Sequence, residues 1–442
     1  MLNETASSRD DRPYVRSPLI EEAPEDRLGA TLRQMVDEVM DVESMVVGPE
    51  TQTPEGEVPR MMLAMGNQLS ARFVGKLKLD SEVAYEQLDQ QFKTLNHLPL
   101  FRIENGKHVI VALEGRVAPE PRPWWPNLLL LIATFFSVLI VGTNLAIQTV
   151  KMENWLLGLA LQANFWSELW RGLPYALSIL LILGAHELGH YFAARRHKLA
   201  VTLPYFIPLP VFSLFGTLGA FIQLREPIRN RKALLDVGAA GPLAGLVFAI
   251  PLLFIGLASA QTGPVTPGGL YEGDSLLYAF AKIVTFGEFL PNGERDVVIN
   301  SSQLAWAGWT GLLVSALNLI PLGQLDGGHI IYALIGERAR WLYYPLLAIM
   351  MGLVLVTNIW LLWVFLLLLF GRVYATPLDM ITPLDNKRRG VAVAALVIFV
   401  LIFVPTPLSS SGEPAAPRAP CSSAQLDTGQ PLASIFSIGT GS

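Results

Sequence analysis

The chain has 442 residues, a formal net charge of −5 and a mean hydropathy of +0.42, and 52% of its residues are hydrophobic. This composition excludes an ordinary soluble globular protein, and the apolar residues gather in long runs typical of a multi-pass membrane protein. No basic block of the kind that binds nucleic acid occurs. The single cysteine, Cys421, excludes an internal disulfide and a cysteine-rich metal site.

The N-terminal part is predicted to precede the membrane. Residues 1–60 are acidic and rich in Pro and Ser, so we expect them to be mostly disordered, apart from an amphipathic helix around residues 28–47. Residues 61–118 are predicted to form a small soluble α/β module. Within it, Asn105-Gly106 separates two apolar runs and indicates a β-hairpin.

Residues 119–406 are predicted to form the membrane domain. Its apolar runs are 127–148, 174–194, 235–260, 303–322, 341–370 and 391–405. The run 341–370 exceeds one span and contains Asn358, which favours either two segments or one long tilted helix. The expected fold is therefore a polytopic α-helical membrane protein with six or seven transmembrane helices, surrounded by lipid. The tail 407–442 is rich in Ser, Pro and Gly and is expected to be disordered.

One apolar segment does not fit a spanning helix. Residues 201–224 contain Pro204, Pro208 and Pro210, which interrupt any regular helix. Irregular backbone is tolerated at membrane depth only where protein or a water-filled cavity satisfies it. We therefore expect a short non-helical segment inside the membrane domain.

The basic residues predict the orientation. Seven Lys and Arg residues lie in the loop between residues 195 and 232, and further basic residues follow at 338–340 and 387–389. The positive-inside rule places these loops, and with them the N-terminus, in the cytoplasm or a stromal equivalent.

The run 174–194 contains the motif H-E-x-x-H at residues 186–190. On a helix, His186 and His190 share one face and can bind one zinc ion, while Glu187 is placed to take a proton from a zinc-bound water. The pattern can arise by chance. However, ionisable residues inside an apolar run are costly and mark functional sites.

A catalytic zinc site needs a third protein ligand and one open position. Arg196 stands where a third histidine would extend the motif, so the metzincin arrangement is excluded. Asp326 lies where the run 303–322 ends, in a segment broken by Pro321 and followed by glycines. Alone, Asp326 would be an ordinary loop residue; beside H-E-x-x-H it becomes the favoured third ligand.

Together the motifs resemble the site-2 protease family of intramembrane zinc metalloproteases, peptidase family M50. The family patterns are H-E-x-x-H and, on a later membrane helix, N-x-x-P-x-x-x-L-D-G, which is matched here by Asn318, Pro321, Leu325, Asp326 and Gly327. The resemblance covers about residues 174–335, the expected core of the membrane domain.

The resemblance implies zinc ligands His186, His190 and Asp326, with Glu187 as general base and Asn318 as an oxyanion donor. It further implies that Phe215–Leu224 forms an extended β segment near the active site, which could pair with an unwound substrate strand. The implied activity is regulated intramembrane proteolysis, with another protein's transmembrane helix as the substrate.

The resemblance is closest to a branch without a PDZ domain, as in plant plastid and cyanobacterial forms, because the loop 261–302 is too short for one. Three other functions compete with it. A catalytically dead relative would lack the glutamate or a ligand, and a desaturase-like oxidoreductase would need several histidine boxes, whereas only six histidines occur. A transporter with structural zinc would bind metal without hydrolysis.

Overall fold

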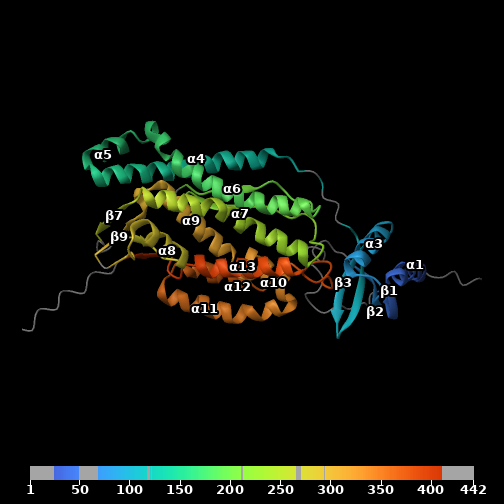
Figure 1. Ribbon diagram of the computed structural model, residues 1–442. Coiled ribbons are helices and arrows are strands. Elements are labelled where there is room, and N and C mark those ends of the chain that lie inside the picture. The colour runs from blue at the N-terminus through green and yellow to red at the C-terminus, as the bar shows by residue number, and fades with distance from the viewer. Residues whose placement is uncertain are drawn as a thin grey trace, which may run out of the picture.

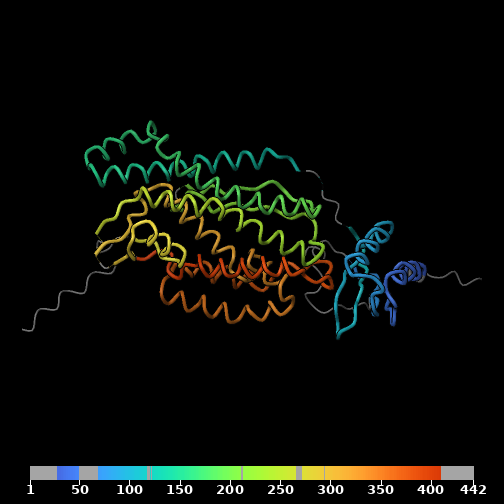
Figure 2. The backbone as a smooth tube through the Cα atoms, in the orientation of Figure 1, coloured from blue at the N-terminus to red at the C-terminus, as the bar shows by residue number. Residues whose placement is uncertain are grey.

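The computed structural model describes residues 24–48, 68–116, 120, 122–210, 213–264, 270–292 and 294–410. They form an elongated helical bundle, from α4 to α13, with a module of strands and two helices at one end (Figures 1 and 2). Most of the predicted disordered residues, 1–23 and 411–442, lie outside the described part of the chain.

The N-terminal module is a four-stranded antiparallel sheet in the order β1-β2-β4-β3. Asn105 and Gly106 both have positive φ, 49° and 80°, and form the turn between β3 and β4. Its elements are α1 Pro24–Val39, β1 Met40–Val47, β2 Leu69–Leu77, α3 Ser81–Lys93, β3 His97–Glu104 and β4 Lys107–Glu114.

The module begins earlier than the sequence suggests. Residues 24–48 fall in the segment expected to be mostly disordered, yet they form α1 and β1. The expected helix over residues 28–47 ends at Val39, and the chain continues as a strand paired with β2. The physical reason is packing, because Leu32, Val36 and Val39 are fully buried in the core of the module.

A short segment fastens the module to the bundle. Leu378–Met380 lies between the edge strand β3 and the residues just before α7. On one side, the backbone of Phe101 donates to Leu378 and accepts from Met380, at 2.9 and 3.1 Å; on the other, Leu378 and Asp379 donate to Ile228 and Arg229. This pairing covers the β3 edge, which would otherwise expose unpaired backbone groups.

Among the described residues, four helical stretches are long and apolar enough to cross a membrane: α4 (Trp125–Glu153), η1 (Phe165–Gly172) with α6 (Leu173–Arg196), α7 (Arg231–Ala258), and α10 (Asp326–Ile335) with η3 (Gly336–Leu342) and α11 (Tyr343–Val356). The remaining elements are α5 Trp155–Ala163, β7 Gln261–Pro264, β8 Leu270–Glu272, α8 Leu276–Phe286, β9 Arg295–Val298, η2 Ile299–Ser301, α9 Gln303–Asn318, α12 Trp360–Phe370, α13 Asn386–Ile402 and β10 Leu408–Ser410.

Several apolar runs do not form a single helix of membrane-spanning length. Helix α9 covers 16 residues of the run 303–322, and α13 covers 17 residues beginning at Asn386. The run 341–370 forms two helices, α11 and α12, which are separated at Thr357–Ile359. By length and composition, four spans are therefore supported among the described residues, against the six or seven expected.

The described part of residues 201–224 contains a β-hairpin, as expected of a non-helical segment. Strand β5 (Tyr205–Pro208) pairs antiparallel with β6 (Thr217–Phe221). A side chain of α4 bonds the backbone just before β5: the Asn127 amide donates to the carbonyls of Leu203 and Pro204, at 2.8 and 3.0 Å. Irregular backbone is therefore hydrogen-bonded within the bundle rather than left to lipid.

Candidate metal centre

The centre of the bundle is built on close helix contacts. Helices α6, α7 and α9 pack against one another, and α10 packs on α7. A Cβ atom at Gly241 of α7 would lie 2.0 Å from His190 Nε2, and one at Gly238 would lie 2.8 Å from His329 Cβ. Glycine at these positions lets α7 pass directly beneath the histidines.

His186 and His190 lie one turn apart on α6 and are 3% and 6% exposed. Their Nε2 atoms are 3.2 Å apart. The Nδ1 of His190 lies 2.7 Å from the carbonyl of Val237, which accepts its proton. That hydrogen bond leaves the Nε2 lone pair directed into the cluster, as in metal-binding histidines.

Asp326 is brought to these histidines by the break after α9. That helix ends at Asn318, and the chain turns through Gly323, which has a φ of 58°. Asp326 is the first residue of α10. A Cβ at Gly327 would lie 2.0 Å from the carbonyl of Leu319, so only glycine fits after the aspartate.

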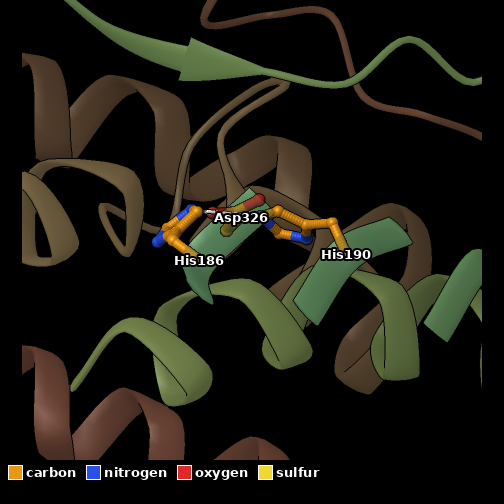
Figure 3. Close-up of side chains that lie close together, drawn as sticks. All are labelled: His186, His190 and Asp326. Carbon is orange, nitrogen blue, oxygen red and sulfur yellow. Dashed lines mark hydrogen bonds and ion pairs between the residues drawn. The ribbon is translucent and has the colours of Figure 1, made fainter. Parts of the chain in front are cut away.

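The three side chains point toward one another from α6 and α10 (Figure 3). Asp326 Oδ2 is 3.3 Å from the Nε2 of each histidine. With the 3.2 Å between the two nitrogens, the three atoms form a nearly equilateral triangle. Donors bound at ~2.0–2.1 Å to one tetrahedral ion are separated by roughly 3.3 Å, so this set fits three corners of a zinc site.

The chemistry of the donors supports the same conclusion. Two imidazole lone pairs and a carboxylate converge in a buried place, and none supplies a proton when the histidines are neutral. Such a cluster is stabilised by a cation at its centre. Among the described residues, His186, His190 and Asp326 are the group of His, Cys, Asp and Glu side chains arranged to hold one.

A cavity of about 220 Å³ adjoins the triangle. Glu187, which is 5% exposed, and Asn318 both line it. The Nδ2 of Asn318 lies 3.4 Å from His186 Nε2. Ala220, Phe221 and Ile222, from β6 and the residue that follows it, also line this cavity. The five residues predicted from sequence thus come together, beside the hairpin predicted to lie near them.

Sequence reasoning overlooked two histidine contacts. His329 lines the same cavity, and its buried Nδ1 has no hydrogen-bond partner within the described residues. Its position three residues after Asp326, on the same helix face, was the available signal. His197, just after the end of α6, contacts Asp236 of α7, with Nε2 2.8 Å from Oδ2.

The comparisons with known proteins match the part of the chain that contains the metal centre. Residues 174–359 match the family model described as peptidase family M50. The chain is 32% identical over 249 residues to the probable zinc metalloprotease EGY2, chloroplastic, of Arabidopsis thaliana, covering 55% of this chain and 44% of that protein. It is 28% identical over 368 residues to the probable zinc metalloprotease EGY1, chloroplastic, of Oryza sativa subsp. japonica, covering 75% and 62%.

The chain thus spans about half the length of the curated relatives it matches. No solved structure matches it. The names of these relatives and the donor set agree on zinc as the metal of the His-His-Asp cluster.

Proposed function

We propose that this chain, whose residues 174–359 match the peptidase family M50 model, is an intramembrane zinc metallopeptidase. It hydrolyses peptide bonds within or near transmembrane helices of other membrane proteins. The observation that supports this proposal most strongly is the triangle of His186, His190 and Asp326. It lies between apolar helices, with Glu187 at its side. Release of a membrane-tethered regulator is the corresponding physiological role.

Each polar residue of the cavity has a role in this proposal. His186, His190 and Asp326 would hold a zinc ion, which would supply Lewis-acid chemistry by lowering the pKa of water and polarising a carbonyl. Glu187 accepts the proton of the attacking water and returns it to the departing amine. The Asn318 amide, at the end of α9, donates to the oxygen on which negative charge develops.

The hairpin supports an extended substrate. Strand β6 pairs with β5 on one side, and within the described residues no strand pairs with its other edge. Leu218 and Phe221 of β6 are 66% and 49% exposed. A transmembrane helix hides its carbonyls in its own hydrogen bonds, so it must unwind before cleavage, and the β6 edge offers replacement backbone partners.

The module end of the bundle is proposed to face the cytoplasm or stroma. Helix α6 ends there at Arg195 and Arg196, and α7 and α13 begin there at Arg231 and Asn386. Basic residues gather at these helix ends, as the positive-inside rule requires of that side.

The test is cleavage of model transmembrane substrates by purified full-length protein in detergent. Wild type, Glu187→Gln, a chelator-treated sample and Glu288→Gln are compared. Glu288 is a matched control, because it lies outside the metal centre and pairs with Arg295 at 2.5 Å. We expect cleavage by wild type and Glu288→Gln only, and restoration by zinc after chelation. Equal cleavage by Glu187→Gln would refute the mechanism.

A further inference from the structure

A second and larger cavity lies at the end of the bundle opposite the N-terminal module. Its volume is about 690 Å³. One wall is the C-terminal half of α4, and another is the ribbon of β7 and β9 (Figure 1). Ser213 and Leu214, at the tip of the β5–β6 hairpin, form part of the lining, as does Trp306 of α9. The metal centre does not use this cavity.

Two buried polar side chains of the lining have unused hydrogen-bonding capacity. Trp306 is 8% exposed, and its indole N–H meets no acceptor within the described part of the chain. Glu272 is 7% exposed, and the one side-chain hydrogen bond recorded for its carboxylate comes from the Tyr278 hydroxyl, at 2.7 Å. A buried donor without a partner is costly, so the indole indicates an acceptor supplied by a ligand.

The charges around Glu272 do not balance. Lys282 is completely buried and lies 2.7 Å from Asp274 and 3.3 Å from Asp296. Its ammonium also lies 4.8 Å from the ring centre of Tyr278. Glu272 is a third carboxylate against this single ammonium, and burial raises its pKa to about 7. A cationic ligand would compensate the surplus negative charge.

The hairpin connects this cavity to the metal centre. Its tip, at Ser213 and Leu214, lines the large cavity, whereas Ala220 lines the cavity beside the triangle. The extended part of this path runs from Thr217 to Ala220, roughly 10 Å, because Ser213–Gly216 form a turn in which Gly216 N–H donates to the Ser213 carbonyl at 3.2 Å. A substrate strand that follows β6 from the metal centre therefore reaches the edge of the large cavity after about four residues, and the cavity, at about 690 Å³, holds roughly three more.

We propose that this cavity binds the flank of the substrate and selects a cationic group about seven residues from the scissile bond. Glu272 pairs with the cation, and the Trp306 indole donates to a peptide carbonyl beside it. The cation is a Lys or Arg side chain, or the α-amino group of a substrate already shortened at this side. This inference rests on the proposed peptidase function for its substrate, but it concerns a separate site.

Binding is measured first, with full-length Glu187→Gln protein in detergent, because this variant is expected to hold substrate without cutting it. Each labelled model transmembrane substrate carries one Lys, Gln or Glu at a single position. The positions tested lie from four to ten residues on either side of the scissile bond. We expect Lys near position seven to bind about tenfold more tightly than Gln, which is roughly 1.4 kcal/mol, with Glu weakest. Equal affinities at all positions would overturn the proposal.

Further variants assign the contacts. Adding Glu272→Gln should abolish the preference for Lys, whereas Glu288→Gln, an acid at the same end of the bundle, should leave it intact. Trp306→Phe keeps an aromatic ring but removes the indole N–H donor. It should therefore weaken the binding of the Lys, Gln and Glu substrates by the same factor. Peptides that start at position seven, with a free or an acetylated amino terminus, distinguish the α-amino group from a side chain. A preference that persists in Glu272→Gln would refute the assignment.

Cleavage by protein with Glu187 intact separates this inference from the peptidase proposal. Chelator-sensitive cleavage without any preference for Lys leaves the peptidase standing and overturns the cation site. Glu272-dependent binding without cleavage of any substrate supports the cation site and overturns the peptidase.

Discussion

Asp236 accepts two hydrogen bonds from Arg388, 152 residues further along the chain, at 2.8 and 2.6 Å. The same carboxylate contacts His197 at the end of α6. One side chain of α7 thus ties together the end of the helix that carries the histidines and the start of α13. This contact explains how three helix ends are held beside the N-terminal module.

Asp236→Asn should lower the free energy of unfolding by about 2 kcal/mol, because it removes a charge-assisted, partly buried pair of hydrogen bonds. Thermal unfolding in detergent measures the change. Glu43→Gln is the control, since the ion pair of Glu43 with Lys107 is about half exposed and should contribute under ~0.5 kcal/mol. A smaller effect for Asp236→Asn than for Glu43→Gln would contradict this account.

Gly241→Ala should abolish zinc binding, because the new Cβ would lie 2.0 Å from the coordinating nitrogen of His190. The readout is zinc per chain after purification. Gly352→Ala on α11 serves as the control, since nothing lies within 4 Å of a Cβ there and alanine favours helices. Normal zinc content in Gly241→Ala would mean that α7 does not pack against the ligands as described.

Removal of zinc should lower the unfolding temperature, because two nitrogens and a carboxylate then face one another at 3.2–3.3 Å without a cation.

Asp326→Asn should weaken zinc binding by about 100-fold or more, as a neutral amide replaces an anionic ligand. Zinc titration followed by thermal unfolding measures both effects. An Asp326→Asn protein with undiminished affinity would remove Asp326 from the ligand set.

The affinity for a cationic substrate flank should fall as the pH is lowered from 8 to 6. Burial raises the pKa of Glu272 to about 7, while the Tyr278 hydroxyl and Lys282 oppose that shift and Asp296 adds to it. Glu272 is therefore anionic above this pH and becomes neutral below it, so attraction to the cation is lost on acidification. Asp274, which pairs with Lys282, is a further carboxylate close to this group. The Glu272→Gln protein therefore serves as the reference that isolates the contribution of Glu272 to the pH dependence. Binding isotherms across this range should show a pH dependence that this variant lacks.

Local patterns in the sequence predicted several features that the structure contains. Asn105-Gly106 forms the expected turn, the proline-rich segment contains strands and no described helix, H-E-x-x-H lies on α6, and the second motif spans the break between α9 and α10. Each of these features depends on residues that are close in the sequence and on the geometry of a single helix or turn. Such features can therefore be predicted from the sequence alone. A helix was expected around residues 28–47, but strand β1 was missed, because it forms by pairing with β2, which follows later in the chain.

By itself, the sequence determined a membrane-embedded helical protein with H-E-x-x-H on one helix and an aspartate after a later helix break. Only the tertiary structure decided that Asp326 Oδ2 stands 3.3 Å from both histidines, that Glu272 and Trp306 share a cavity, and that Leu378–Met380 holds the module. Hydrophobic periodicity records which residues leave water or face lipid, but it carries no information on which distant segments meet. That choice follows in part from small residues such as Gly241 and Gly327, whose missing side chains leave room for the His190 ring and for the Leu319 carbonyl.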